Sequence, residues 1–205
     1  MSLVVMKQLL FGFAFVLFSL GSKSQSDTLM DYTMSLIGKK LPAYQSKTID
    51  GKTIDSSYFK GKITILSFFG FGCAPCNQEL SLLCELSKTL PKENYQILLL
   101  GDATEKDLRD LRAYRSKDFG KMKRKLGIDT LAFDIVADCP ENPVRILMRN
   151  CKGSKETFQV SAMPTTFFIN KQGIIKDICM GFALPRNKEF DAYFYSKLKQ
   201  AEATE

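Results

Sequence analysis

The sequence contains no histidine and no tryptophan, and only six cysteines among its 205 residues. The lack of histidine excludes catalytic pairs of cysteine and histidine, metal sites built on imidazole, and haem attachment through Cys-x-x-Cys-His. Structural zinc needs four ligands, and only one pair of the cysteines has the Cys-x-x-Cys spacing. We therefore expect no metal site, and no cofactor other than a cysteine pair.

The sequence also lacks a strong excess of either basic or acidic residues. The chain has 29 basic and 22 acidic residues, a net charge of +7. Without Lys7 and Lys23, which lie in a predicted leader, the counts are 27 and 22 and the net charge is +5. The basic residues cluster between Arg109 and Lys125 rather than alternating with aromatic residues along the chain, which is typical of a solvated helix face. We expect no nucleic-acid partner.

No apolar run is long enough for a comfortable membrane span. Leu9 to Leu20 is apolar for about a dozen residues, follows Lys7, and precedes small residues at Ser22 and Ser24. This pattern predicts a signal peptide over 1–24. The alternative is an uncleaved N-terminal anchor, which would be the only membrane contact. In both cases the domain lies outside the cytoplasm, in a periplasmic or otherwise extracytoplasmic space.

The rest of the chain has the length and apolar content of one domain. We expect 25–40 to be a flexible N-terminal segment and 41–205 to be the folded domain. Asp50-Gly51 predicts a hairpin turn between two short strands. Strands and helices then alternate, which favours an α/β fold with parallel strands. The expected strands are 63–69, 95–100, 133–137, 166–169 and 174–180, and the expected helices are 77–90, 104–114 and 187–199.

Two cysteines, Cys73 and Cys76, lie where the strand 63–69 passes into the helix 77–90. The N-terminus of a helix presents unpaired N–H groups and a partial positive charge, which stabilise a thiolate and should lower the pKa of Cys73. Pro75 suits the first turn of a helix. The pattern predicts that Cys73 attacks and Cys76 resolves in thiol–disulfide exchange. A structural disulfide and half of a zinc site remain the alternatives.

A second motif lies far downstream, at Met163-Pro164-Thr165-Thr166-Phe167-Phe168-Ile169-Asn170. Together with the cysteine pair, it makes 41–198 resemble the thioredoxin superfamily, and within it the TlpA/ResA-like extracytoplasmic thiol–disulfide oxidoreductases. The resemblance implies a thioredoxin-like fold: a central mixed sheet flanked by helices, with an N-terminal β-hairpin and, before a cis-proline loop, an insertion at about 139–160.

The resemblance also implies roles for single residues. Glu79 matches the acidic residue that ResA-like proteins place near their cysteines, and it is a candidate catalytic group with Cys73 and Cys76. The client-facing surface would include the following residues: Met163, Pro164, Thr165, Gly72, Ala74 and Pro75. Three positions depart from the family pattern. Gly72 replaces the usual tryptophan, Ser67 replaces the buried aspartate of thioredoxins, and Ser81 replaces a proline that many TlpA-like chains have.

The leading hypothesis is an enzyme that reduces disulfides in client proteins and receives electrons from a membrane or extracytoplasmic donor. The alternative is a binding module in which the insertion recognises a partner and the thiols are secondary. A peroxidase is disfavoured, because neither Phe69 nor Leu66 supplies the proline of the peroxiredoxin motif.

The other four cysteines have no fixed pairing in the sequence. Cys139 and Cys151 flank the insertion, and a tentative structural disulfide between them would close a short loop. Cys84 falls on the helix after the cysteine pair, and Cys179 falls on the strand 174–180. We expect both to be small core residues.

Overall fold

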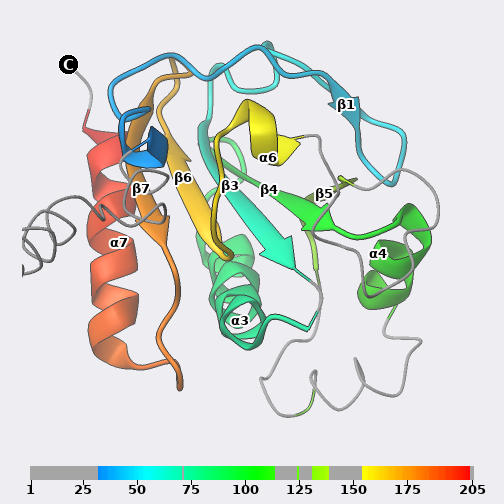
Figure 1. Ribbon diagram of the computed structural model, residues 1–205. Helices are drawn as coiled ribbons and strands as arrows, with labels where there is room; N and C mark the ends of the chain where they lie inside the picture. Colours follow the sequence, from blue (N-terminus) through cyan, green and yellow to red (C-terminus); the bar gives the residue numbers. More distant parts are fainter. Residues whose placement is uncertain (1–31, 71, 114–123, 125–130, 139–153, 204–205) are drawn as a thin grey trace, which may run out of the picture.

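The computed structural model describes residues 32–70, 72–113, 124, 131–138 and 154–203 (Figure 1). A five-stranded sheet with the order β5-β4-β3-β6-β7 runs through the centre of the domain. The strands β3, β4 and β5 are parallel, whereas β6 is antiparallel to β3 and β7 is antiparallel to β6. The predicted mixed sheet is therefore confirmed. Its strands are β3 (Ile63–Gly70), β4 (Tyr95–Asp102), β5 (Asp134–Ala137), β6 (Thr165–Ile169) and β7 (Ile175–Met180).

The helices begin at polar caps that the sequence supplies. Thr104 accepts a hydrogen bond from the Asp107 N–H, and Asn187 accepts one from the Phe190 N–H. The main helices are α3 (Ala74–Thr89), α4 (Glu105–Arg112) and α7 (Lys188–Glu202), with a short α6 (Ser154–Thr157). The predicted N-terminal hairpin is also present, as β1 (Ser46–Lys47) paired antiparallel with β2 (Thr53–Ile54). No helix in the described part of the chain is long and apolar enough to cross a membrane.

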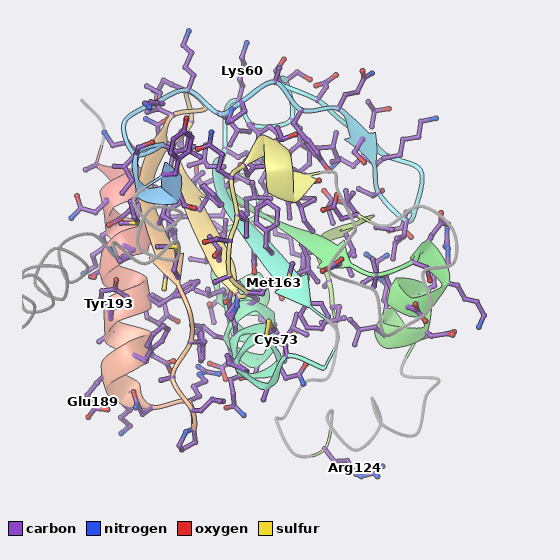
Figure 2. All side chains as sticks on the ribbon, in the orientation of Figure 1. Lys60, Cys73, Arg124, Met163, Glu189 and Tyr193 are labelled. Carbon is purple, nitrogen blue, oxygen red and sulfur yellow. A yellow bond between two sulfur atoms is a disulfide. The ribbon has the colours of Figure 1, made fainter. Side chains whose placement is uncertain are left out.

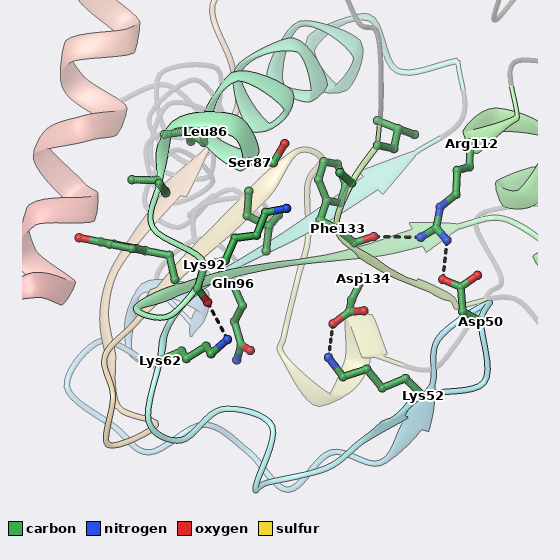
Figure 3. A pocket seen from close by; sticks show the side chains of 15 residues that line it. Asp50, Lys52, Lys62, Leu86, Ser87, Lys92, Gln96, Arg112, Phe133 and Asp134 are labelled. Carbon is green, nitrogen blue, oxygen red and sulfur yellow. Dashed lines mark hydrogen bonds and ion pairs between the residues drawn. The ribbon is translucent and has the colours of Figure 1, made fainter.

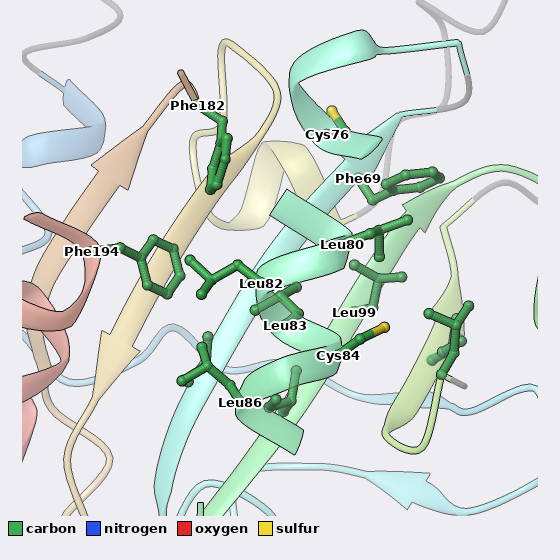
Figure 4. Close-up of a cluster of buried hydrophobic side chains, with 14 of the residues drawn as sticks. Phe69, Cys76, Leu80, Leu82, Leu83, Cys84, Leu86, Leu99, Phe182 and Phe194 are labelled. Atoms are coloured by element: carbon green, nitrogen blue, oxygen red, sulfur yellow. The ribbon is translucent and has the colours of Figure 1, made fainter. Parts of the chain in front are cut away.

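One face of the sheet packs against α3 and α7 (Figure 4). The strand residues Ile65, Phe69 and Leu99 point to this face, because side chains alternate between the two sides of a strand. Leu80 and Leu83 of α3 and Phe194 of α7 fill the space above them. This packing fixes the position of the active-site helix relative to the end of β3.

The opposite face carries a second apolar cluster, which includes Leu66 and Phe68 of β3. Leu36 is buried in this cluster, the Gly38 N–H donates to the Ile175 carbonyl, and the Leu41 N–H donates to the Gly173 carbonyl. Residues 32–40, the described part of the segment 25–40, therefore pack against the sheet, and the flexibility of the segment stays a prediction. The polar sequence of this segment gives no sign of the sheet face that Leu36 helps to cover.

The predicted insertion has two parts. Residues 139–153 lie outside the described residues, whereas 154–160 pack onto the sheet. The Asp138 carboxylate accepts hydrogen bonds from the Ser154 N–H at 2.9 Å and from the Ser154 hydroxyl at 2.6 Å, and this hydroxyl is also 2.9 Å from the Tyr44 hydroxyl. Asp138 and Ser154 are therefore held next to each other just after the end of β5.

Phe158 ties this segment to the core, and its replacement by alanine should destabilise the protein. Its ring is fully buried and packs edge-on against the rings of Tyr44 and Phe68. Loss of such a ring leaves a cavity, so we expect Phe158→Ala to lower the free energy of unfolding by about 3–5 kcal/mol in a urea titration. Tyr193→Ala, at a half-exposed ring on α7, is the matched control. Equal small losses for both variants would contradict this packing.

Candidate active site

The cysteine pair lies at the N-terminus of α3, at the end of β3 (Figure 2). Cys73 and Cys76 form a disulfide with a Cα–Cα distance of 5.2 Å. Cys73 is the N-cap of α3, and its sulfur accepts a hydrogen bond of 3.1 Å from the Cys76 N–H. Cys73 is partly exposed, whereas only 1% of Cys76 is exposed. Cys73 is therefore the sulfur that a client can reach, and the helix terminus favours its thiolate form.

Two glycines shape the approach to Cys73. Gly72 has a φ of +75°, in the left-handed region that residues with a side chain rarely adopt, so a tryptophan at this position would strain the backbone found here. At Gly70, a Cβ atom would lie 2.9 Å from the sulfur of Met163, so any side chain would push Met163 away. The glycines allow the β3–α3 turn to lie against the loop that carries Met163.

That loop has a cis peptide bond between Met163 and Pro164. The sulfur of Cys73 lies 3.6 Å from the Met163 carbonyl oxygen, and the Pro164 carbonyl accepts a hydrogen bond of 2.8 Å from the Gly181 N–H. Gly72 and Ala74 are exposed beside it, while Met163 and Pro75 are partly exposed.

Thr165 belongs to the predicted client-facing set, and its contact with a client stays a prediction. Its side chain is buried, and its hydroxyl donates to the Ala162 carbonyl at 2.8 Å. This residue therefore shapes the cis-proline loop from inside, and Pro164 is buried as well.

Glu79 is a buried carboxyl on the same helix face as Cys76, three residues further on. The Ser67 hydroxyl donates to Glu79 Oε1 at 2.7 Å, and the Thr166 hydroxyl donates to the same oxygen. Burial raises the pKa of Glu79 to about 7, against the opposing effect of these two hydrogen bonds. Glu79 was predicted from the family resemblance, whereas the contact of Thr166 with it was not, because two adjacent threonines in a strand do not show which of them faces α3.

The remaining described cysteines, Cys84 and Cys179, are buried and form no disulfide, so the expectation of two core residues is confirmed. Burial raises the pKa of Cys179 to about 12, which keeps it a neutral thiol at neutral pH. Cys139 and Cys151 lie outside the described residues, and their pairing stays a prediction. Among the described residues, no group of three or more metal-ligating side chains lies together.

A pocket of about 420 Å³ lies at the opposite end of the sheet, where β4 begins (Figure 3). Ion pairs neutralise two of its cations, because Lys52 pairs with Asp134 and Arg112 pairs with Asp50. No cysteine lines this pocket. The Cys73–Cys76 disulfide lies outside this pocket, at the end of the sheet that carries the cis-proline loop.

A cysteine pair at the start of a helix, facing a cis-proline loop on a mixed sheet, defines a thioredoxin-like thiol–disulfide oxidoreductase. Residues 37–178 match the model of the AhpC/TSA family. The chain is 30% identical over 145 residues to the thiol-disulfide oxidoreductase ResA of Bacillus thuringiensis subsp. konkukian, covering 69% of each protein. The chain belongs to the AhpC/TSA family and, within it, is a relative of the ResA thiol–disulfide oxidoreductases.

Other proteins show more distant similarity. The thioredoxin-like protein YneN of Bacillus subtilis is 25% identical over 154 residues, which cover 74% of this chain and 76% of YneN. A thiol-disulfide isomerase from Corynebacterium glutamicum has a TM-score of 0.55 at 14% identity, with 82% of this chain and 98% of that chain covered. A thiol:disulfide interchange protein from Chlorobium tepidum has a TM-score of 0.51 at 20% identity, with 80% and 96% covered. These two structures establish the shared fold.

Proposed function

We propose that the protein reduces disulfide bonds in client proteins outside the cytoplasm, through Cys73 and Cys76. The observation that carries this proposal is the position of Cys73: it caps α3, it is partly exposed, and its sulfur lies 3.6 Å from the Met163 carbonyl oxygen. A thiolate there is stabilised by the helix terminus and can be reached by a disulfide that docks against the loop.

In the first step, the reduced Cys73 thiolate attacks one sulfur of the client disulfide. The Cys73–client S–S bond forms as the client S–S bond breaks. The other client sulfur leaves with the bonding electron pair as a thiolate and then takes a proton. The exposed Gly72 and Ala74, with the partly exposed Met163 and Pro75, form the surface that holds the client during this step.

In the second step, Cys76 loses its proton to the Glu79 carboxylate, and the Cys76 thiolate attacks the sulfur of Cys73. The Cys73–Cys76 bond forms, the Cys73–client bond breaks, and the second client sulfur leaves as a thiolate. The proton held by Glu79 passes on to that thiolate or to solvent. The client gains two electrons and two protons, and the protein is left in the disulfide form seen in the structure.

Two further parts of this proposal rest on sequence and chemistry. The pattern of residues 1–24 supports export by a signal peptide, and an oxidising space is where a client disulfide would persist. Each cycle consumes two electrons, so a membrane-bound or extracytoplasmic dithiol donor must reduce the Cys73–Cys76 disulfide again.

Trapping the covalent intermediate tests this function. Cys76→Ser removes the resolving thiol, so the mixed disulfide formed by Cys73 should accumulate. We expect the reduced variant, mixed with insulin as a model disulfide substrate, to give an adduct at Cys73 by mass spectrometry. Cys73→Ser should give none. An adduct at another cysteine, or none with Cys76→Ser, would contradict the assignment.

A further inference from the structure

A row of polar side chains crosses the sheet below Glu79. Ser67 of β3 is in register with Thr166 of β6, and Thr166 is in register with Cys179 of β7. Residues directly opposite each other on neighbouring strands point to the same face, so the three side chains lie in one line beneath α3. All three are buried, in a region that is otherwise apolar.

Two members of this row, Ser67 and Thr166, bind the carboxyl of Glu79 through a single oxygen atom. The hydroxyls of Ser67 and Thr166 both donate to Oε1, from two different strands. Neither hydrogen bond involves Oε2. A carboxyl held at one oxygen from two strands has a fixed direction relative to α3, which also carries Cys76.

We propose that Ser67 is a positioning residue for the exchange reaction and that Thr166 shares this role: their hydroxyls hold Glu79 so that its second oxygen is available to the proton of Cys76. This inference rests on the proposed function of the cysteine pair. The step it serves breaks the Cys76 S–H bond and forms an O–H bond on Glu79, which leaves a Cys76 thiolate and a neutral carboxyl. Ser67 thus does not replace the aspartate of thioredoxins as a base; it anchors a carboxylate that comes from the helix.

The electrostatics agree with this geometry. A hydroxyl that donates to a carboxylate favours its ionised form, whereas burial favours the protonated form. Cys76 lies three residues before Glu79 on α3, and Glu79 acts electrostatically on Cys179 of β7. Lys197 of α7 acts on Cys179, but an ion pair of 2.9 Å with Asp177 offsets its charge. The two hydroxyls are therefore the groups that favour an ionised Glu79 near neutral pH.

The pH profile of disulfide reduction tests the role of Ser67. With dithiothreitol as the electron donor and insulin as the substrate, the rate should rise with pH as Glu79 ionises. This rising limb of the pH profile should be absent in Glu79→Gln. Ser67→Ala removes one donor, so the midpoint of this limb should move up by about one pH unit. Thr166→Val should shift it in the same direction, and Ser67→Thr, which keeps a hydroxyl, should restore the wild-type midpoint.

Ser87→Ala is the matched control, because the Ser87 hydroxyl donates to the Cys84 carbonyl of its own helix and does not touch Glu79. A second readout does not depend on activity. The pKa of Glu79 is measured from the NMR shift of its carboxyl carbon as a function of pH, in the disulfide form of each variant. If Ser67→Ala does not fold, Thr166→Val is measured in its place. If the pKa of Glu79 is unchanged in these variants while Glu79→Gln still lacks the rising limb, the positioning role of Ser67 and Thr166 is overturned and the proposed function is not. A wild-type protein that does not reduce insulin would instead overturn the proposed function.

Discussion

Replacing Cys73 with serine should lower the rate of client disulfide reduction by about a thousandfold or more. The sulfur of Cys73 accepts the Cys76 N–H at the start of α3, so the helix terminus stabilises the thiolate that attacks. A serine hydroxyl in the same place is not ionised at neutral pH and forms no disulfide. The assay is dithiothreitol-dependent reduction of insulin by wild type and variant at equal concentration.

The fold should survive this change, which makes the loss of rate interpretable. Cys73 is the N-cap of α3, and serine is among the best N-cap residues, so the hydrogen bond at the helix start can be kept. Cys84→Ala, on the same helix, removes a buried thiol outside the pair and should keep most of the activity. A Cys73→Ser protein with activity close to that of wild type would rule out Cys73 as the attacking group.

The sequence predicted this part of the molecule well because the signals are local. The apolar run from Ile63 predicted β3, and the Cys-x-x-Cys spacing with Pro75 predicted where a helix begins. The helix starts at Ala74 rather than at Asn77, since the cysteine pair belongs to its first turn. Family resemblance added Glu79 and the loop at Pro164, which spacing alone would not have brought together.

The parts that the sequence did not predict depend on contacts between distant residues. Thr166 meets Glu79 across 87 positions of sequence, through the register of β6 against β3. Register depends on how both strands pack and turn, so a threonine pair in a strand does not say which member faces α3. In the same way, the burial of Leu36 depends on an open face of the sheet and not on the polar sequence around it.

Glu79 should also make the stability of the protein depend on pH. Its folded pKa is about 7 and its ordinary value is 4.5, because burial disfavours the charged form. Between these values the folded state binds one more proton than the unfolded state, so raising the pH favours unfolding. The contribution of Glu79 should therefore lower the free energy of unfolding by up to about 3 kcal/mol from pH 4.5 to 7, with no further loss above that range.

Glu79→Gln isolates this effect, because glutamine keeps an oxygen that can accept from Ser67 and Thr166 but cannot ionise. Urea titrations of the disulfide forms should show the variant gaining stability relative to wild type as the pH rises from about 4.5 to 7. Glu93→Gln, at an exposed position between α3 and β4, should show no such trend. A constant difference between Glu79→Gln and wild type across this range would mean that the carboxyl is already ionised in the folded protein at low pH, and Glu79 could then not store the proton of Cys76.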